Sequence, residues 1–340
     1  MRIGNTAQRL ALGVLAPLFA ASPSWSQGES LDELIAAAKA EGQLVVYSSQ
    51  AENQTEAILK AFGEQYGITA TFLRLTTTPL VQRFATELQS GAPEADVLSI
   101  SSPTPYDENP DWFLEISEEN IPAVAGWPAR WVEERHLIWT TENMVAVYNS
   151  EVVDGEDVPE TWQDLIDGKW LGQVVFTDPR GSENYLGWLD AMERAHGMEF
   201  LEALRNLEYT LTQSGASGAQ MVAAGAQAVN FPSFPSFIIP LESAGAPVVA
   251  KPIVDPLVVS PRSLGISANA PHPNAARLFV HWLLSEEGMR ATCAVAPTPL
   301  AGDPEGKFGC NPAADPDPIH FGIPQDRIEA LLGAVGLSAN

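Results

Sequence analysis

The chain has 340 residues, with 18 lysines and arginines against 43 aspartates and glutamates, and its net charge is −25. Such a charge repels nucleic acid and anionic lipid headgroups, so we exclude both as partners. The length suffices for a large hydrophobic core and for two lobes. No apolar stretch after the first 27 residues is long enough for a transmembrane helix, which predicts a soluble product.

Residues 1–27 have the order of a secretory signal peptide. The segment begins with a positively charged part that contains Arg2 and Arg9. An apolar run follows at 10–21, and small residues come next. This run is too short to span a bilayer, and no cysteine follows it to indicate a lipid anchor. The alternative is a buried N-terminal helix. We interpret the segment as a signal peptide, which predicts a periplasmic protein.

The first part of the remaining chain alternates helices and strands. Ser30 and Glu33 form a capping box ahead of apolar residues at helical spacing. Thr78 and Pro79 are residue types that open a helix. The order of elements predicts a parallel sheet covered by helices. We expect helix 30–41, strand 44–47, helix 49–66, strand 68–75, helix 78–89 and strand 95–100.

The later part contains two long extended segments, 136–149 and 257–267. They predict an α/β fold of two lobes, each a mostly parallel sheet flanked by helices, joined by hinge strands. A ligand is expected in the cleft between the lobes, outside the carboxyl ends of the strands. The other expected elements are helix 162–166, strand 174–177, helices 183–195 and 198–207, strand 227–230 and helix 274–284. The predicted division is 28–141 plus 261–292 for lobe 1 and 142–260 plus 293–340 for lobe 2.

The chain has two cysteines, Cys293 and Cys310. In an oxidising compartment they are expected to form a disulfide across a short loop. The alternatives are two free thiols or metal ligands. A metal site needs further ligands nearby, and the closest histidine, His320, stands alone. We therefore predict a disulfide and no metal.

Several stretches together share the residue order of one protein family. Residues 37–48 read AAKAEGQLVVYS, residues 61–68 read AFGEQYGI, and Ala95-Asp96-Val97-Leu98 follows. Near the end come APHPNAARLF at 270–279 and LSEEG at 284–288. In this order they resemble the class II periplasmic solute-binding proteins of ABC transporters (extracellular solute-binding family 1), in particular the ferric-ion-binding type.

The resemblance implies the periplasmic-binding-protein type II fold, whose two lobes close on a ligand and present it to ABC permease subunits. Members carry ferric iron, thiamine, polyamines, phosphonates or sugar phosphates. Many ferric members place two adjacent tyrosines after a strand of the second lobe, because phenolates suit ferric iron. The matching stretch here, 228–234, offers Asn230 and Ser233 but no tyrosine. This difference favours an organic ligand, anions included, over iron.

The candidate ligand-binding residues follow predicted strands or precede predicted helices, where backbone N–H groups and the helix dipole favour an anion. For the serines and threonines the alternative role is a helix cap or turn, and for Arg180 it is a surface ion pair. Arg74, Arg83 and Arg262 are further cations that suit an anionic ligand. The candidates are Ser48, Ser49, Thr76, Thr77, Ser101, Ser102, Arg180, Ser182, Asn184, Asn230 and Ser233.

The predicted function is the substrate-binding component of an ABC importer, acting as a monomer, without a cofactor and without catalysis. The sequence contains no Gly-x-Ser-x-Gly elbow, P-loop or zinc-protease motif. Paired-carboxylate catalysis stays open, because proximity among the acidic residues is not readable from sequence. The alternatives are ferric iron bound by a non-standard ligand set and a secreted enzyme. An effector-sensing domain would normally come with a DNA-binding or membrane-spanning segment, and neither is evident.

Overall fold

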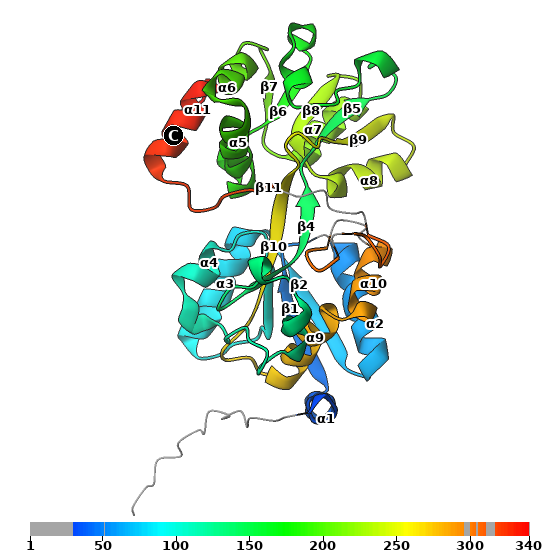
Figure 1. Cartoon of the computed structure of the whole chain (residues 1–340), viewed down its shortest axis with the longest axis vertical. Helices are drawn as coiled ribbons and strands as arrows, with labels where there is room; N and C mark the ends of the chain where they lie inside the picture. The colour runs from blue at the N-terminus through cyan, green and yellow to red at the C-terminus, as the bar shows by residue number, and fades with distance from the viewer. Residues whose placement is uncertain (1–29, 51, 296–299, 304, 311–316, 340) are drawn as a thin grey trace, which may run out of the picture.

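The computed structural model describes residues 30–50, 52–295, 300–303, 305–310 and 317–339. The predicted signal peptide, 1–27, lies outside these ranges. No helix within them is both long and apolar enough to cross a membrane. Figure 1 shows two lobes, each with its own sheet and helices, joined by strands β4 (Leu137–Asn143) and β10 (Val258–Ile266).

The first lobe contains a sheet with the strand order β11-β10-β3-β1-β2, in which β4 also pairs with β10. Strand β1 (Gln43–Ser48) pairs in parallel with β2 (Thr69–Arg74) and with β3 (Val97–Ile100), so the carboxyl ends of all three meet at one edge. The short strand β11 is Asp317–Pro318. The helices of this lobe are α1 (Leu31–Glu41), α2 (Glu52–Tyr66), α3 (Thr77–Ser90), α4 (Thr104–Glu108), α9 (Pro273–Leu283) and α10 (Glu286–Val295).

Local sequence explains where the first helix begins and ends. The Ser30 side chain accepts a hydrogen bond from the Glu33 N–H, and the Glu33 carboxylate accepts one from the Ser30 N–H, as the capping box predicts. The helix stops at Gly42, whose φ of 70° is left-handed and favours glycine. Strand β1 can therefore start one residue later.

The second lobe contains a five-stranded sheet with the order β7-β6-β8-β5-β9. Strand β6 pairs in parallel with β7 and β8, whereas β5 pairs antiparallel with β8 and β9. The strands are β5 (Val145–Asn149), β6 (Val174–Thr177), β7 (Thr210–Thr212), β8 (Val229–Ser233) and β9 (Val248–Pro252). The helices are α5 (Glu183–His196), α6 (Met198–Arg205), α7 (Gly215–Ala223), α8 (Pro235–Ser243) and α11 (Gln325–Ala334).

Short 3₁₀ turns fill the connections in both lobes. The predicted helix 162–166 is one of them, so that segment is shorter and tighter than expected. The turns are η1 (Pro110–Trp112), η2 (Pro122–Gly126), η3 (Ala129–Trp131), η4 (Gly155–Asp157), η5 (Gln163–Ile166), η6 (Gly168–Trp170) and η7 (Pro179–Gly181).

Each lobe packs around its own aromatic core. In the first lobe the Phe62 ring lies 5.2 Å from that of Phe279, which joins α2 to α9. In the second, the Trp162 and Trp188 rings meet edge to face at 5.2 Å, and both side chains are fully buried. Separate cores allow each lobe to move as a rigid unit about the strands between them.

The connecting strands differ from the sequence prediction in one respect. Residues 136–149 were expected as a single extended segment, but they divide into β4 and β5, which belong to different sheets. The division falls at Met144, whose N–H donates to the carbonyl of Val258 on the neighbouring strand. Strand β10 itself starts in the second core with Val258 and ends in the first with Ile266.

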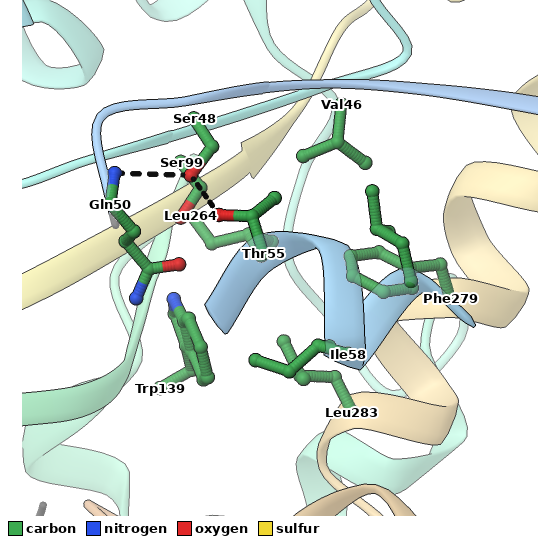
Figure 2. A pocket seen from close by; sticks show the side chains of 11 residues that line it. Val46, Ser48, Gln50, Thr55, Ile58, Ser99, Trp139, Leu264, Phe279 and Leu283 are labelled. Atoms are coloured by element: carbon green, nitrogen blue, oxygen red, sulfur yellow. Dashed lines mark hydrogen bonds between the residues drawn. The ribbon is translucent and has the colours of Figure 1, made fainter. Parts of the chain in front are cut away.

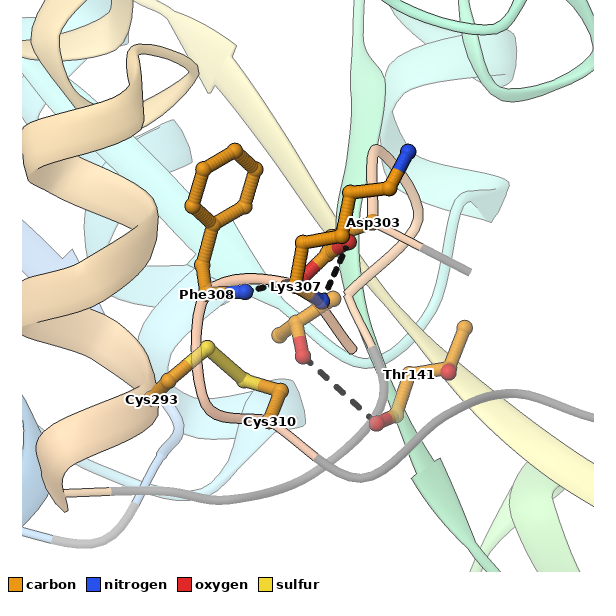
Figure 3. Close-up of a disulfide and its surroundings, with 7 residues drawn as sticks. Thr141, Cys293, Asp303, Lys307, Phe308 and Cys310 are labelled. Atoms are coloured by element: carbon orange, nitrogen blue, oxygen red, sulfur yellow. Dashed lines mark hydrogen bonds between the residues drawn. A yellow bond between two sulfur atoms is a disulfide. The ribbon is translucent and has the colours of Figure 1, made fainter. Parts of the chain in front are cut away.

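The disulfide segment belongs to the first lobe, in contrast to the predicted boundary at residue 293. Cys293 and Cys310 are joined by a disulfide, and both contribute to the first core together with Leu300 and Ala301. In Figure 3 the Asp303 carboxylate accepts hydrogen bonds from the backbone N–H groups of Lys307 and Phe308 beside this disulfide. The chain rejoins the second lobe only later, where Ile319, Leu331, Leu332 and Val335 enter its core.

A buried carboxylate fastens the C-terminal helix α11 to α5. The Asp190 Oδ1 atom accepts a hydrogen bond of 2.7 Å from Arg327 on α11, and Oδ2 accepts one of 3.0 Å from Arg194. Burial opposes ionisation of Asp190, but the hydrogen bonds and charges of the two arginines outweigh it and hold its pKa below the usual value. The ionised form is therefore the one that the fold stabilises.

This lowered pKa gives the stability a defined pH dependence. A carboxyl whose pKa falls on folding contributes stability that is complete above its unfolded pKa of about 4 and is lost as the pH falls through the folded value. We expect Asp190→Asn to lower the free energy of unfolding by about 1–2 kcal/mol at pH 7 and by less at pH 3. Urea unfolding at both pH values measures this; equal losses at both would contradict it.

Candidate ligand-binding site

A cleft of about 600 Å³ opens between the lobes and is lined by side chains from both. Such a volume is in the range of sites that take up small organic molecules. The lining residues from the first lobe and the hinge are Ser49, Arg74, Thr76, Thr77, Thr78, Ser101, Ser102 and Arg262. Those from the second lobe are Gly181, Ser182, Glu183, Asn184, Tyr185, Gln213, Ser214, Phe234, Ser236, Phe237 and Phe321.

Hydroxyl groups dominate the first-lobe wall. They follow the carboxyl ends of β1, β2 and β3, which parallel pairing brings to one edge. The Thr77 and Ser101 hydroxyls lie 3.2 Å apart and are hydrogen-bonded. Thr76 is the N-cap of α3 but its side chain makes no capping hydrogen bond, so the hydroxyl is available to a ligand. This wall also receives the positive end of the α3 dipole.

Two serine hydroxyls on this wall lack partners within the described part of the chain. Ser102 is 4% exposed, and its Oγ atom has no hydrogen-bond partner there. The Oγ atom of Ser49 is also buried and without a hydrogen-bond partner in the described chain. Because buried polar atoms are nearly always hydrogen-bonded, such orphaned groups beside a cleft point to a ligand or water as the missing partner.

The second-lobe wall combines helix N-termini with aromatic rings. Ser182 caps α5 through the N–H of Asn184, and Ser214 caps α7 through the N–H of Ser217. The Phe234 ring lies 5.9 Å from Tyr185 and 6.1 Å from Phe237. Three aromatic side chains from two helix starts thus form one surface, to which Phe321 from the C-terminal segment also contributes.

Tyr185 is held in its neutral form. Burial raises its pKa to about 12, and its hydroxyl oxygen accepts a hydrogen bond from the Gly215 N–H at 3.3 Å. At neutral pH the side chain is therefore a phenol.

The two arginines of the cleft differ in their pairing. Arg262 Nη2 lies 2.6 Å from Glu142 Oε2, and Glu142 also accepts from the Ser236 N–H at 3.2 Å, so this charge is neutralised at the hinge. Arg74 donates from Nε to the Gln50 carbonyl at 3.3 Å and has no acidic partner among the described residues. Arg74 is the unpaired cation of the described lining.

Most of the predicted site residues meet in this cleft. Ser49, Thr76, Thr77, Ser101, Ser102, Ser182 and Asn184 all line it. Their common feature is a position in the loop that precedes a helix or follows a strand, or in the first turn of the helix itself. Asn184 has a further contact, because its side-chain oxygen accepts from the Ser260 hydroxyl of β10 at 3.0 Å.

Ser48 and Arg180 lie elsewhere. The Ser48 side chain points into the first lobe, where its Oγ bonds Thr55 at 3.2 Å and accepts from the Gln50 N–H. Figure 2 shows it beside a small internal cavity of about 20 Å³ rather than the large cleft. Arg180 is exposed, forks onto Asp178 with its Nη2 at 2.7 Å, and is not among the cleft residues. This contact is the surface ion pair that was the alternative role for Arg180.

Asn230 and Ser233 are fully buried and do not reach the cleft. Asn230 Nδ2 donates to the Val175 carbonyl at 3.0 Å and to the Thr177 hydroxyl at 3.2 Å, so it ties β8 to β6. Asn230 lies within the strand that was expected, and the strand extends to 233 rather than ending at 230, which brings Ser233 into it as well.

The structural role of Asn230 is testable. We expect Asn230→Ala to lower the free energy of unfolding by about 2 kcal/mol, because the substitution leaves buried groups of β6 without a partner. The affinity for the solute should stay within about twofold. Chemical unfolding and calorimetric titration of the variant give both values; a large loss of affinity with unchanged stability would return Asn230 to the site.

The residues that the prediction missed reach the cleft through tertiary structure. Arg74 and Arg262 were recognised only as available cations, although Arg74 ends β2 just before the threonines that open α3, whereas Arg262 lies on the hinge strand β10. Phe234 and Phe237 lie on either side of Pro235, the first residue of α8. The start of a helix directly after a strand was the sequence signal that could have placed them at the cleft. Phe321 belongs to the C-terminal tail and carries no local signal.

The described residues contain no group of three or more histidine, cysteine, aspartate and glutamate side chains placed to hold a metal ion. The cleft lining includes two side chains that can supply anionic oxygen, Glu183 and Tyr185. The second of these is a phenol of raised pKa. Hydroxyls, the amides of Asn184 and Gln213, and an unpaired guanidinium make up most of the remaining polar lining.

Comparison with known proteins agrees with this arrangement. Residues 47–290 match the family model described as bacterial extracellular solute-binding protein. Among solved structures, the substrate-binding protein of an ABC transporter from Agrobacterium tumefaciens superposes with a TM-score of 0.72 at 17% identity, covering 86% of this chain and 95% of that one.

Two further structures share the fold and have known ligands. Iron-bound HitA from Pseudomonas aeruginosa gives a TM-score of 0.65 at 20% identity, over 87% of this chain and 99% of that one. AfuA from Actinobacillus pleuropneumoniae, with fructose-6-phosphate bound, gives 0.60 at 18% identity, over 85% and 93%. These likenesses confirm the periplasmic-binding-protein type II fold. Because the family model covers most of the sequence, the chain belongs to the bacterial extracellular solute-binding proteins.

Proposed function

We propose that this protein captures a small organic anion in the interlobe cleft and delivers it to the permease of an ABC importer. The observation that carries the proposal is the position of Arg74, a cation without an acidic partner among the described residues, beside the hydroxyl wall. Helix α3 starts at the same place, and its dipole favours negative charge. An anion would satisfy the guanidinium and the orphaned serine hydroxyls together.

The chemistry of the lining argues for an organic ligand rather than ferric iron. Iron prefers several anionic oxygen or nitrogen ligands, whereas the described lining offers one exposed carboxylate, Glu183, and one buried phenol, Tyr185. Family and fold are those of solute-binding proteins, which are not enzymes. The proposal also includes that the signal peptide directs export of the protein, that the protein is periplasmic, and that it is a monomer.

A thermal-shift screen of the purified protein tests it. The panel contains carboxylates, sugar phosphates, phosphonates, polyamines and ferric citrate. A ligand at a hundred times its Kd adds about 2.7 kcal/mol to the stability, which is readily visible as a rise in Tm. We expect an organic anion to give the largest shift. A shift with ferric citrate, absent with citrate alone and larger than that of any anion, would overturn the proposal.

A further inference from the structure

We propose that the ligand has two parts, a single anionic group that binds the first lobe and a flat ring that packs on the second. This inference rests on the proposed function and specifies the class of solute. It follows from a division in the cleft: the two walls carry different chemistry. An anion without a ring would leave the aromatic side chains of the second-lobe wall without a ligand partner, and an uncharged ring would leave Arg74 without one.

The first-lobe wall is built for charge and hydrogen bonds. Its described lining consists of serines, threonines and Arg74, with no apolar side chain. Ser102, 4% exposed and without a hydrogen-bond partner in the described chain, supplies an unmet donor and acceptor at the ends of the parallel strands. A carboxylate or phosphate monoester has the acceptors that these groups require.

The second-lobe wall adds aromatic side chains to its polar groups and helix N-termini. Tyr185, Phe234 and Phe237 form a chain of neighbouring aromatic side chains, with centroid separations of 5.9 and 6.1 Å, and Phe321 adds a fourth. Tyr185 and Phe234 are buried at 6% and 5% exposure, whereas Phe237 is partly exposed at the start of α8, so of these three rings it is Phe237 that remains partly uncovered. Such surfaces favour stacked or edge-to-face contact with a planar partner.

Charge fixes which end of the ligand meets which lobe. The second-lobe lining contains Glu183 and no lysine or arginine among its described residues. At the hinge, Glu142 already neutralises Arg262. An anionic group therefore finds its unpaired cation at Arg74 and meets repulsion near Glu183. The ring is left to face the aromatic wall.

Matched probes separate the two parts. Calorimetric titration uses phenyl phosphate and phenylacetate as ring-bearing anions, ethyl phosphate and acetate as their ring-free counterparts, and benzyl alcohol as an uncharged ring. We expect one of the two ring-bearing anions to bind at least about tenfold more tightly than its ring-free counterpart, from the apolar area that a phenyl group buries. Benzyl alcohol should bind at least about tenfold more weakly than that anion.

Two substitutions assign the parts to their walls. Phe237→Leu keeps the apolar volume of the helix start and removes the ring. The variant should reduce at least threefold the ratio of the affinity for the ring-bearing anion to the affinity for the ring-free anion. The affinity for the ring-free anion itself should stay unchanged. Arg74→Gln should reduce the ratio of the affinity for the ring-bearing anion to the affinity for benzyl alcohol. It should leave unchanged the ratio of the affinities for the ring-bearing and ring-free anions. Phe308→Leu, at a partly buried aromatic of the first lobe outside the cleft, is the control for both.

The outcomes distinguish this inference from the function on which it depends. Equal affinity for ring-bearing and ring-free anions, or an equal effect of Phe237→Leu on both, would overturn the two-part ligand and leave capture of an anion intact. A ring-free anion as the tight ligand of the broad screen would do the same. Binding of neither anion type by the folded protein would overturn both.

Discussion

Replacing Arg74 by alanine is expected to weaken binding of the anionic solute about a hundredfold, or about 3 kcal/mol. Arg74 ends β2 beside the start of α3, and among the described residues of the cleft it is the cation that lacks an acidic partner. In the proposed complex, the guanidinium and the anion lose water together, and removal of one leaves the other desolvated without a counter-charge.

The matched control is Arg290→Ala, which makes the same change in net charge. Arg290 is exposed on α10, pairs with Glu286 at 2.7 Å and lies outside the cleft lining. Calorimetric titration of both variants against the tightest anion of the screen measures the difference. Equal losses for the two variants would show that Arg74 acts only through the overall charge of the protein.

Asp96→Ala should lower the free energy of unfolding by about 4 kcal/mol. The Asp96 side chain is fully buried, and its carboxylate accepts from the N–H groups of Val45 and His272, each at 2.7 Å. Its Oδ2 atom also lies 3.0 Å from the His272 ring nitrogen Nδ1. Alanine would leave all of these groups without a partner and create a cavity.

Asp96→Asn provides the graded comparison, since it keeps the volume and one acceptor oxygen. We expect it to lose about half as much stability as alanine. Urea unfolding followed by circular dichroism measures both, provided that the transition is two-state or that the first lobe unfolds separately. A free energy of unfolding of Asp96→Ala within 1 kcal/mol of that of the original protein would contradict the role of Asp96 as the link between β1 and α9.

This link explains why distant stretches of the sequence carried the family resemblance together. Asp96 precedes β3, whereas His272 comes shortly before α9, and the carboxylate joins them. Glu41 makes a similar connection, because its side chain accepts from the Ala275 N–H at 2.8 Å at the start of the same helix. The residues recognised in sequence are thus those that hold the first lobe together, and they say little about the ligand.

The serine and threonine loops of the first lobe were predictable for a general reason. Parallel strands end at one edge, and polar residues between those ends and the following helices must meet there. The rule fails for Ser48 because it is still part of β1, where successive side chains alternate between the two faces of the sheet. Ser48 points toward Thr55, and Ser49, one residue later, reaches the cleft.

The aromatic wall was not predictable, because it assembles from segments distant in sequence. Tyr185 is on α5, Phe237 on α8, and Phe321 lies in the tail that returns to the second lobe after the disulfide segment. Composition alone does not show which lobe a tail rich in proline and glycine packs against. The same gap in information explains the misplaced boundary at residue 293.

A crystal structure of the protein with the tightest anion of the solute screen tests the account most directly. We predict density for the ligand between the lobes, with its charged group within hydrogen-bond distance of Arg74 and the start of α3, and with its ring against Phe237. A ligand bound outside this cleft, or one whose charged group lies on the second-lobe wall near Glu183, would contradict the account.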